Sequence, residues 1–75
     1  MAKKNASGQR VYKRIELVGV STKNYEDAIE GAVRRASETL KGLSWFEVKE
    51  MRGGIRDGRV AEYQVVLVIS FELHG

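Results

Sequence analysis

Hydrophobic and polar residues alternate along three stretches of this chain, residues 11–18, 44–52 and 60–73. A period of two residues is typical of strands that bury one face. The last stretch is the longest, and every odd-numbered residue in it from 63 to 73 is apolar. The pair Asp57-Gly58 between the last two stretches favours a turn, so these two strands are expected to form a hairpin.

Residues 25–41 follow a different period and predict an amphipathic helix. The apolar positions recur at spacings of three and four and form one stripe, made of Tyr25, Ile29, Ala32, Val33, Ala36 and Leu40. The segment Ser21-Thr22-Lys23-Asn24 before the helix has turn and N-cap chemistry, and Gly42 after it favours a left-handed stop. The element order is therefore strand, helix, strand, strand.

This order predicts an α+β fold in which one helix lies across one face of a three-stranded antiparallel sheet. The side chains expected to meet the helix stripe are Ile15, Leu17, Phe46, Val48 and the odd-numbered residues of the last strand. The opposite face is expected to carry Trp45, Met51, Gln64, Val66 and Val68 among charged residues. An apolar patch of this kind marks an interface or a ligand site. Because 75 residues form only a small core, self-association is the expected route to stability.

Trp45 and Gln64 are too far apart to contact one ring system within a single chain. If the hairpin turns near residues 57 and 58, Gln64 lies across from about Met51, roughly six residues or about 20 Å from Trp45. A ligand that they share would need the two residues from different subunits. An indole stacks on flat rings and an amide offers a donor beside an acceptor, so an isoalloxazine or a nucleobase fits this pair.

The composition limits the chemistry further. The chain has no cysteine, and its one histidine is His74, so neither disulfides nor a metal site built from these ligands is expected. Residues 1–10, which include Lys3, Lys4 and Arg10, are interpreted as a disordered basic tail, and residues 11–75 as a single domain. No apolar run reaches the ~20 residues of a membrane span, and no signal peptide is visible, so a cytoplasmic protein is expected.

Motifs for catalysis are missing from the sequence. It has no serine in a nucleophile-elbow context, and its paired glycines at 53 and 54 are not followed by a helix that would hold a phosphate. A binding protein is therefore expected rather than an enzyme. A small basic nucleic-acid-binding module is an alternative, because the net charge is +3 and an aromatic ring on a sheet can stack on bases.

Three segments, in this element order, resemble the dodecin family. They are Val11-Tyr12-Lys13-Arg14-Ile15-Glu16-Leu17-Val18-Gly19, Trp45-Phe46-Glu47-Val48-Lys49-Glu50 and Glu62-Tyr63-Gln64-Val65. The resemblance covers about residues 11–73, and the order Trp45, Arg52, Gln64 makes it specific. It implies a hollow homododecamer in which each subunit wraps its sheet partly around one helix.

The resemblance also implies a function. Dodecins bind flavins at subunit interfaces, which implies FMN, riboflavin or FAD as the cofactor and coenzyme A as a further ligand. The implied roles are ring stacking for Trp45, hydrogen bonding to the polar edge of the isoalloxazine for Gln64, and a flavin contact for Arg52. The implied biological role is flavin storage, sequestration and photoprotective quenching. A flavin-dependent enzyme is a further alternative, but tight stacking between tryptophans would leave its flavin little access to a substrate.

Overall fold

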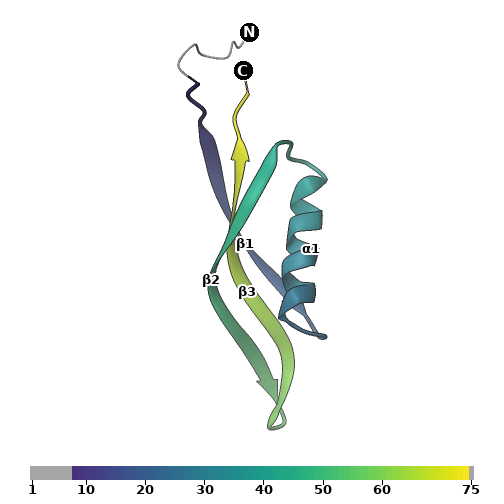
Figure 1. Ribbon diagram of the computed structural model, residues 1–75. Helices are drawn as coiled ribbons and strands as arrows, with labels where there is room; N and C mark the ends of the chain where they lie inside the picture. Colours follow the sequence, from purple (N-terminus) through teal and green to yellow (C-terminus); the bar gives the residue numbers. More distant parts are fainter. Residues whose placement is uncertain (1–7, 75) are drawn as a thin grey trace.

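The computed structural model describes residues 8–74, and its elements follow the predicted order. They are β1 (Tyr12–Ser21), α1 (Tyr25–Ser37), β2 (Leu43–Arg56) and β3 (Arg59–Glu72), shown in Figure 1. The strands form one antiparallel sheet in the order β1-β3-β2. The predicted β-α-β-β fold is confirmed. Residues 1–7 of the predicted tail lie outside the described residues.

The turn between β1 and α1 has the capping chemistry that the sequence predicts. Asn24 is the N-cap, and its side-chain oxygen accepts a hydrogen bond from the backbone N–H of Asp27 at 2.7 Å. Ser21, the last residue of β1, donates its hydroxyl to the Asp27 carboxylate at 2.8 Å. These bonds tie the end of the strand to the first turn of the helix.

The helix α1 ends at Ser37, four residues before the predicted boundary at residue 41. The chain nevertheless keeps a helical course beyond it, because the backbone N–H of Leu40 donates to the carbonyl of Ala36 at 3.0 Å. Leu40 packs against the core, which explains why the apolar stripe extends that far. Gly42 has a φ of +77°, the left-handed conformation that the sequence predicts there.

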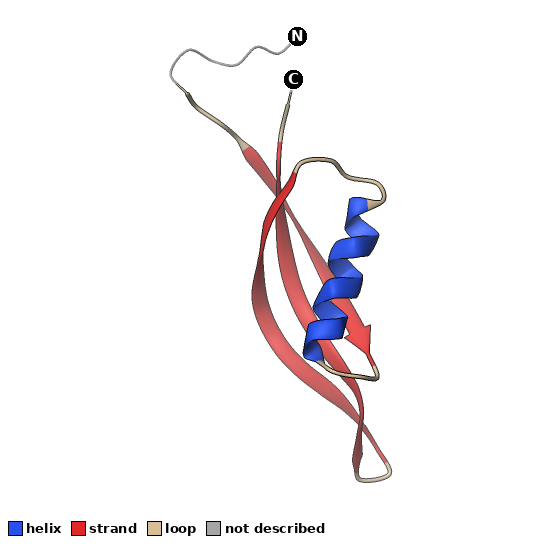
Figure 2. Cartoon of the chain, turned by 45° about the vertical axis from the view of Figure 1, so that its right-hand side comes forward, coloured by secondary structure: helices blue, strands red, loops and turns tan. Residues whose placement is uncertain are grey.

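The core lies where α1 covers β1 and β3, on one side of the sheet (Figure 2). Its buried members are Ala28, Ala36, Val65, Leu67 and Ile69. The expectation that Phe46 and Val48 join this core is wrong for the single chain. Both pair with core residues of β3 on the helix side, but they keep 46% and 41% of their surface exposed because α1 does not cover β2.

The helix comes very close to the backbone of β1 at Gly19. A Cβ at this position would fall on the carbonyl oxygen of Ala28 and 3.2 Å from the Cβ of Ala32. Glycine is therefore required here by packing, and the position sets how closely α1 can approach the sheet.

A register shift in β2 between Val48 and Glu50 reverses the alternation of the strand. Beyond it, Met51 pairs with Val65 and therefore lies on the helix side. The prediction that Met51 shares the face of Trp45 is wrong for this reason. The same shift brings Arg52 onto the opposite face, where it pairs with Gln64.

The hairpin between β2 and β3 turns at Asp57 and Gly58, as predicted. Their φ values are 54° and 75°, and a two-residue loop with both values positive fits the type I′ turn that matches the twist of paired strands. The turn of the hairpin extends well beyond the N-terminal end of α1 (Figure 1).

Candidate ligand site on the uncovered face of the sheet

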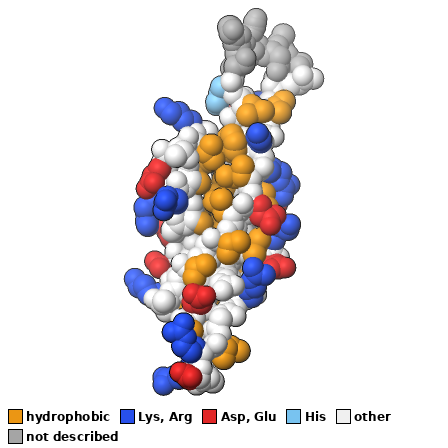
Figure 3. Space-filling view, turned by 180° about the vertical axis from the view of Figure 1, so that it is seen from behind, with side chains coloured by type: hydrophobic (Ala, Val, Ile, Leu, Met, Phe, Trp, Pro, Cys, Tyr) orange, Lys and Arg blue, Asp and Glu red, His pale blue; other side chains and the backbone are white. Residues whose placement is uncertain are grey.

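A single chain leaves much of its apolar surface uncovered. Ten large hydrophobic residues are exposed among those described: Val11, Val18, Val20, Trp45, Phe46, Val48, Met51, Ile55, Val60 and Leu73. Seen from behind, hydrophobic side chains gather in a strip along the molecule, with charged side chains on both flanks (Figure 3). Exposed apolar surface of this extent, on both faces of the sheet, marks surfaces that other molecules cover.

Two ion pairs cross the middle of the face opposite α1. Arg14 on β1 contacts Glu47 on β2 at 2.8 Å, and Lys49 on β2 contacts Glu16 on β1 at 3.1 Å. Since β3 lies between β1 and β2, both pairs cross β3.

The ion pairs explain the burial of two β3 residues on a face that no helix covers. Val66 and Val68 lie beneath these crossing side chains and are buried. They were expected to contribute to the open apolar patch, and this part of the expectation is wrong for the described chain. The predicted site residues lie at the two ends of this face, on either side of the ion pairs.

One end holds Trp45, which pairs with Ser70 of β3. The indole is 47% exposed, and its ring centroid lies 4.8 Å from that of Tyr12, with the ring planes inclined at 52°. The neighbouring Ser44 lies at a register shift and has no partner in the β2–β3 pairing. This end of the face therefore offers a large flat ring to a ligand.

The other end holds Arg52 and Gln64, side by side on β2 and β3. The Nε of Arg52 donates to Oε1 of Gln64 at 3.1 Å, and Nε2 of Gln64 donates to Glu62 at 3.0 Å. Arg52 also donates through Nη1 to Glu50 at 3.0 Å. Because arginine only donates and carboxylates only accept, this network fixes the orientation of the Gln64 amide.

The Gln64 amide keeps hydrogen-bonding capacity for a ligand. An amide has two N–H donors and two acceptor lone pairs, and the network uses one of each. One donor and one acceptor remain on an amide whose orientation the network holds. This is the pattern that a heterocycle edge with an adjacent acceptor and donor requires.

The structure brings Arg52 and Gln64 together but keeps Trp45 away from them. Gln64 is six residues along β3 from Ser70, the partner of Trp45, which is about 20 Å at ~3.3 Å per residue. The separation expected from the sequence is confirmed. Sequence reasoning missed Tyr12, because only the register across β3 brings it next to Trp45. It also missed the carboxylates of Glu50 and Glu62, although each lies two residues before Arg52 or Gln64 on the same strand, a spacing that puts the two side chains on one face.

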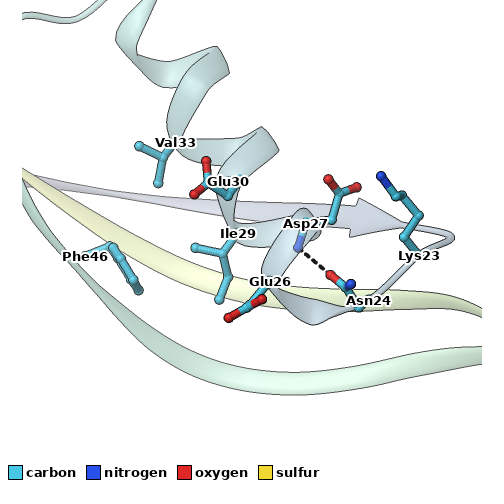
Figure 4. Close-up of a pocket in the computed structure, with 8 residues that line it drawn as sticks. All are labelled: Lys23, Asn24, Glu26, Asp27, Ile29, Glu30, Val33 and Phe46. Atoms are coloured by element: carbon cyan, nitrogen blue, oxygen red, sulfur yellow. Dashed lines mark hydrogen bonds between the residues drawn. The ribbon is translucent and has the colours of Figure 1, made fainter.

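A separate groove of about 730 Å³ lies on the helix side, between α1 and β2 (Figure 4). Ile29, Val33 and Phe46 form its apolar part. Its polar part comes from the first turns of α1 and the residues before it: Lys23, Asn24, Glu26, Asp27 and Glu30. None of the predicted site residues lines it, and it holds no histidine, cysteine or serine that could act as a nucleophile.

Within residues 8–74, no cluster of three or more histidine, cysteine, aspartate or glutamate side chains is arranged to hold a metal ion. The single helix described is too short to cross a bilayer.

Comparison with known proteins identifies the family. The family model described as Dodecin matches residues 11–74. The chain belongs to the dodecin family. It is 55% identical to the dodecin of Thermus thermophilus over 64 residues, which cover 85% of this chain and 93% of that protein.

Solved dodecin structures agree with the fold. The dodecin of Streptomyces coelicolor superposes with a TM-score of 0.85 at 45% identity, over 88% of this chain and 94% of that one. The calcium dodecin of Mycobacterium tuberculosis superposes with a TM-score of 0.75 at 30% identity, over 84% and 90% of the two chains. That protein is described as calcium chelating, with a novel calcium-binding site. The resemblance read from the sequence is thus confirmed.

Proposed function

We propose that this dodecin binds flavins, FMN or riboflavin, at interfaces between the subunits of a homododecamer, and that it stores and shields them without transforming them. The observation that carries the proposal is the division of the site on each chain. A stacking residue and a hydrogen-bonding pair lie on the same face, about 20 Å apart, and neither end alone encloses a ligand. A second copy that brings its Gln64 to the first copy's Trp45 completes the site.

Each end would contribute a different interaction. The exposed indole of Trp45 would stack on the isoalloxazine ring, for which offset packing of flat aromatic systems is favourable. The donor and acceptor that Gln64 retains would pair with the polar edge of the ring. Arg52 would hold the amide in orientation and offer its remaining N–H groups to the flavin.

The proposed role is storage and photoprotective quenching rather than catalysis. Stacking on tryptophan offers an excited flavin a route to return to the ground state. A ring enclosed between subunits has no open path to a substrate, and the described residues form no metal-binding cluster beside Trp45 or Gln64.

The nucleic-acid alternative has less support. The basic side chains on the uncovered face are paired with carboxylates: Arg14 with Glu47, Lys49 with Glu16 and Arg52 with Glu50. Phosphate binding would have to break these pairs, whereas a flavin ring can use the face with the pairs intact.

A fluorescence titration tests the proposal. Flavin emission is followed while the purified oligomer is added to FMN or to riboflavin, and saturable quenching at about one flavin per chain is expected. The quenching should persist at raised salt, because stacking does not depend on counterion release, whereas binding to nucleic acid weakens steeply with salt. Absence of quenching with both flavins would refute the proposal. Competition by coenzyme A in the same assay tests the other ligand that the family resemblance implies.

A further inference from the structure

Tyr12 and Trp45 meet above the middle strand of the sheet. Tyr12 is the first residue of β1 and pairs with Glu72, whereas Trp45 lies on β2 and pairs with Ser70. Neighbouring strands are about 4.8 Å apart, so the backbones of β1 and β2 are separated by about 10 Å. The two rings span this distance and approach to 4.8 Å between centroids.

Ser70 makes room for this contact. It is the β3 residue opposite Trp45, its side chain is on the same face, and it is only 1% exposed. Its hydroxyl has no hydrogen-bond partner within the described part of the chain. The position next to the indole is therefore filled by a small side chain without a hydrogen bond, between Trp45 on β2 and Arg14 on β1.

Trp45 needs a neighbour to hold its ring in place. It follows a register shift at Ser44, and close to half of its surface is exposed. A free indole on such a strand samples several rotamers and loses that freedom when a ligand stacks on it, which weakens binding. Tyr12 is partly buried, and its ring is the aromatic contact that the structure gives the indole.

We propose that Tyr12 is a positioning residue for the flavin site. Its ring braces the Trp45 indole in the orientation that leaves one side open for stacking. The inference rests on the proposed function, but it concerns the state of Trp45 before any flavin binds. The phenol hydroxyl has no hydrogen bond among residues 8–74, so the ring alone carries the role.

Two substitutions separate the ring from the hydroxyl. Tyr12→Phe keeps the ring and should leave the dissociation constant for FMN within about twofold of the parent. Tyr12→Ala removes the brace and should weaken FMN binding by about five- to tenfold, within the roughly 2- to 13-fold range expected for ordering one side chain on binding. Tyr12→Leu fills similar volume without an aromatic ring and should behave like Tyr12→Ala, which guards against a variant that simply fails to fold.

A double-mutant comparison tests whether Tyr12 acts through Trp45. In a Trp45→Ala background, Tyr12→Ala should cause no further loss of affinity, because there is no indole left to position. A loss of the same size in both backgrounds would overturn the inference, since it would mean that Tyr12 touches the flavin directly. Parent-like affinity of both Tyr12→Ala and Tyr12→Leu would also overturn it.

A measurement without flavin keeps the inference distinct from the proposed function. Trp45 is the only tryptophan in the sequence. The tryptophan bands of the near-ultraviolet circular dichroism spectrum, and the anisotropy of fluorescence excited above 295 nm, would therefore report on this ring. The parent and Tyr12→Phe should show an ordered indole, and Tyr12→Ala and Tyr12→Leu a more mobile one. If the parent bound no flavin, the proposed function would fail while this comparison still decided the role of Tyr12. An indole equally ordered in all four proteins would overturn the positioning role.

Discussion

Replacing Trp45 by alanine is the most direct perturbation of the proposed flavin site. Close to half of the surface of Trp45 is exposed, and the residue is not part of the buried core. Removing its side chain should therefore leave the fold of the subunit intact. Flavin binding should weaken strongly, because the surface on which the isoalloxazine stacks is gone.

The size of the loss follows from the exposed part of the ring. A tryptophan side chain offers on the order of 250 Å², and Trp45 keeps 47% of its surface exposed. A ligand stacked on one side would cover roughly half of that remainder, about 60 Å², which corresponds to about 1.5 kcal/mol at ~25 cal/mol per Å². Aromatic stacking adds about 0.5–1.5 kcal/mol. The sum of about 2–3 kcal/mol predicts a dissociation constant about 30- to 150-fold higher.

The assay is the quenching of FMN fluorescence by purified parent and variant oligomers at equal subunit concentration. Size-exclusion chromatography with light scattering checks that both assemble alike. Trp45→Phe is the matched control, because it keeps a smaller ring and should lie between the parent and Trp45→Ala. If the assembled Trp45→Ala oligomer bound FMN as tightly as the parent, the stacking role and the magnitude derived from it would both be wrong.

The remaining predictions concern packing and hydrogen bonding. Gly19→Ala places a methyl group on a backbone carbonyl and should lower the free energy of unfolding in denaturant by about 1–3 kcal/mol. Its control is Gly31→Ala, whose new methyl group meets no atom within 4 Å and should raise that free energy by about 0.5–1 kcal/mol. Equal effects of the two substitutions would contradict the close approach of α1 to Gly19. Ser70→Ala removes a buried hydroxyl without a partner and should leave the melting temperature unchanged or raised, whereas a clear drop would mean that assembly supplies the partner. Gln64→Leu removes the amide and should raise the dissociation constant for riboflavin by roughly 5- to 150-fold, the equivalent of about 1–3 kcal/mol, while the oligomer stays intact. An unchanged dissociation constant would exclude hydrogen bonds from Gln64 to the edge of the flavin ring.

The elements and their order could be predicted because each has a local signal. Alternation marks the strands, the three-and-four spacing marks the helix, and Asp57-Gly58 marks the hairpin turn. The capping of α1 by Asn24 was also visible, since side-chain capping is a local interaction. The distance between Trp45 and Gln64 followed from the turn position and the rise per residue alone.

The positions of several side chains could not be predicted, because they depend on contacts between strands. The register shift after Val48 contains no glycine or proline, so simple alternation placed Met51 on the wrong face. The burial of Val66 and Val68 depends on ion pairs between β1 and β2, and their geometry follows only from the strand order.

The division of the proposed site gives each chain two independent halves. A chain without a functional Trp45 would still supply Gln64 to its neighbour, and a chain without Gln64 would still supply Trp45. Oligomers mixed from two such defective chains would therefore contain some complete sites, although neither chain alone could form any. Genetic complementation between two inactive alleles is the consequence of placing the stacking ring and the amide about 20 Å apart on one strand pair.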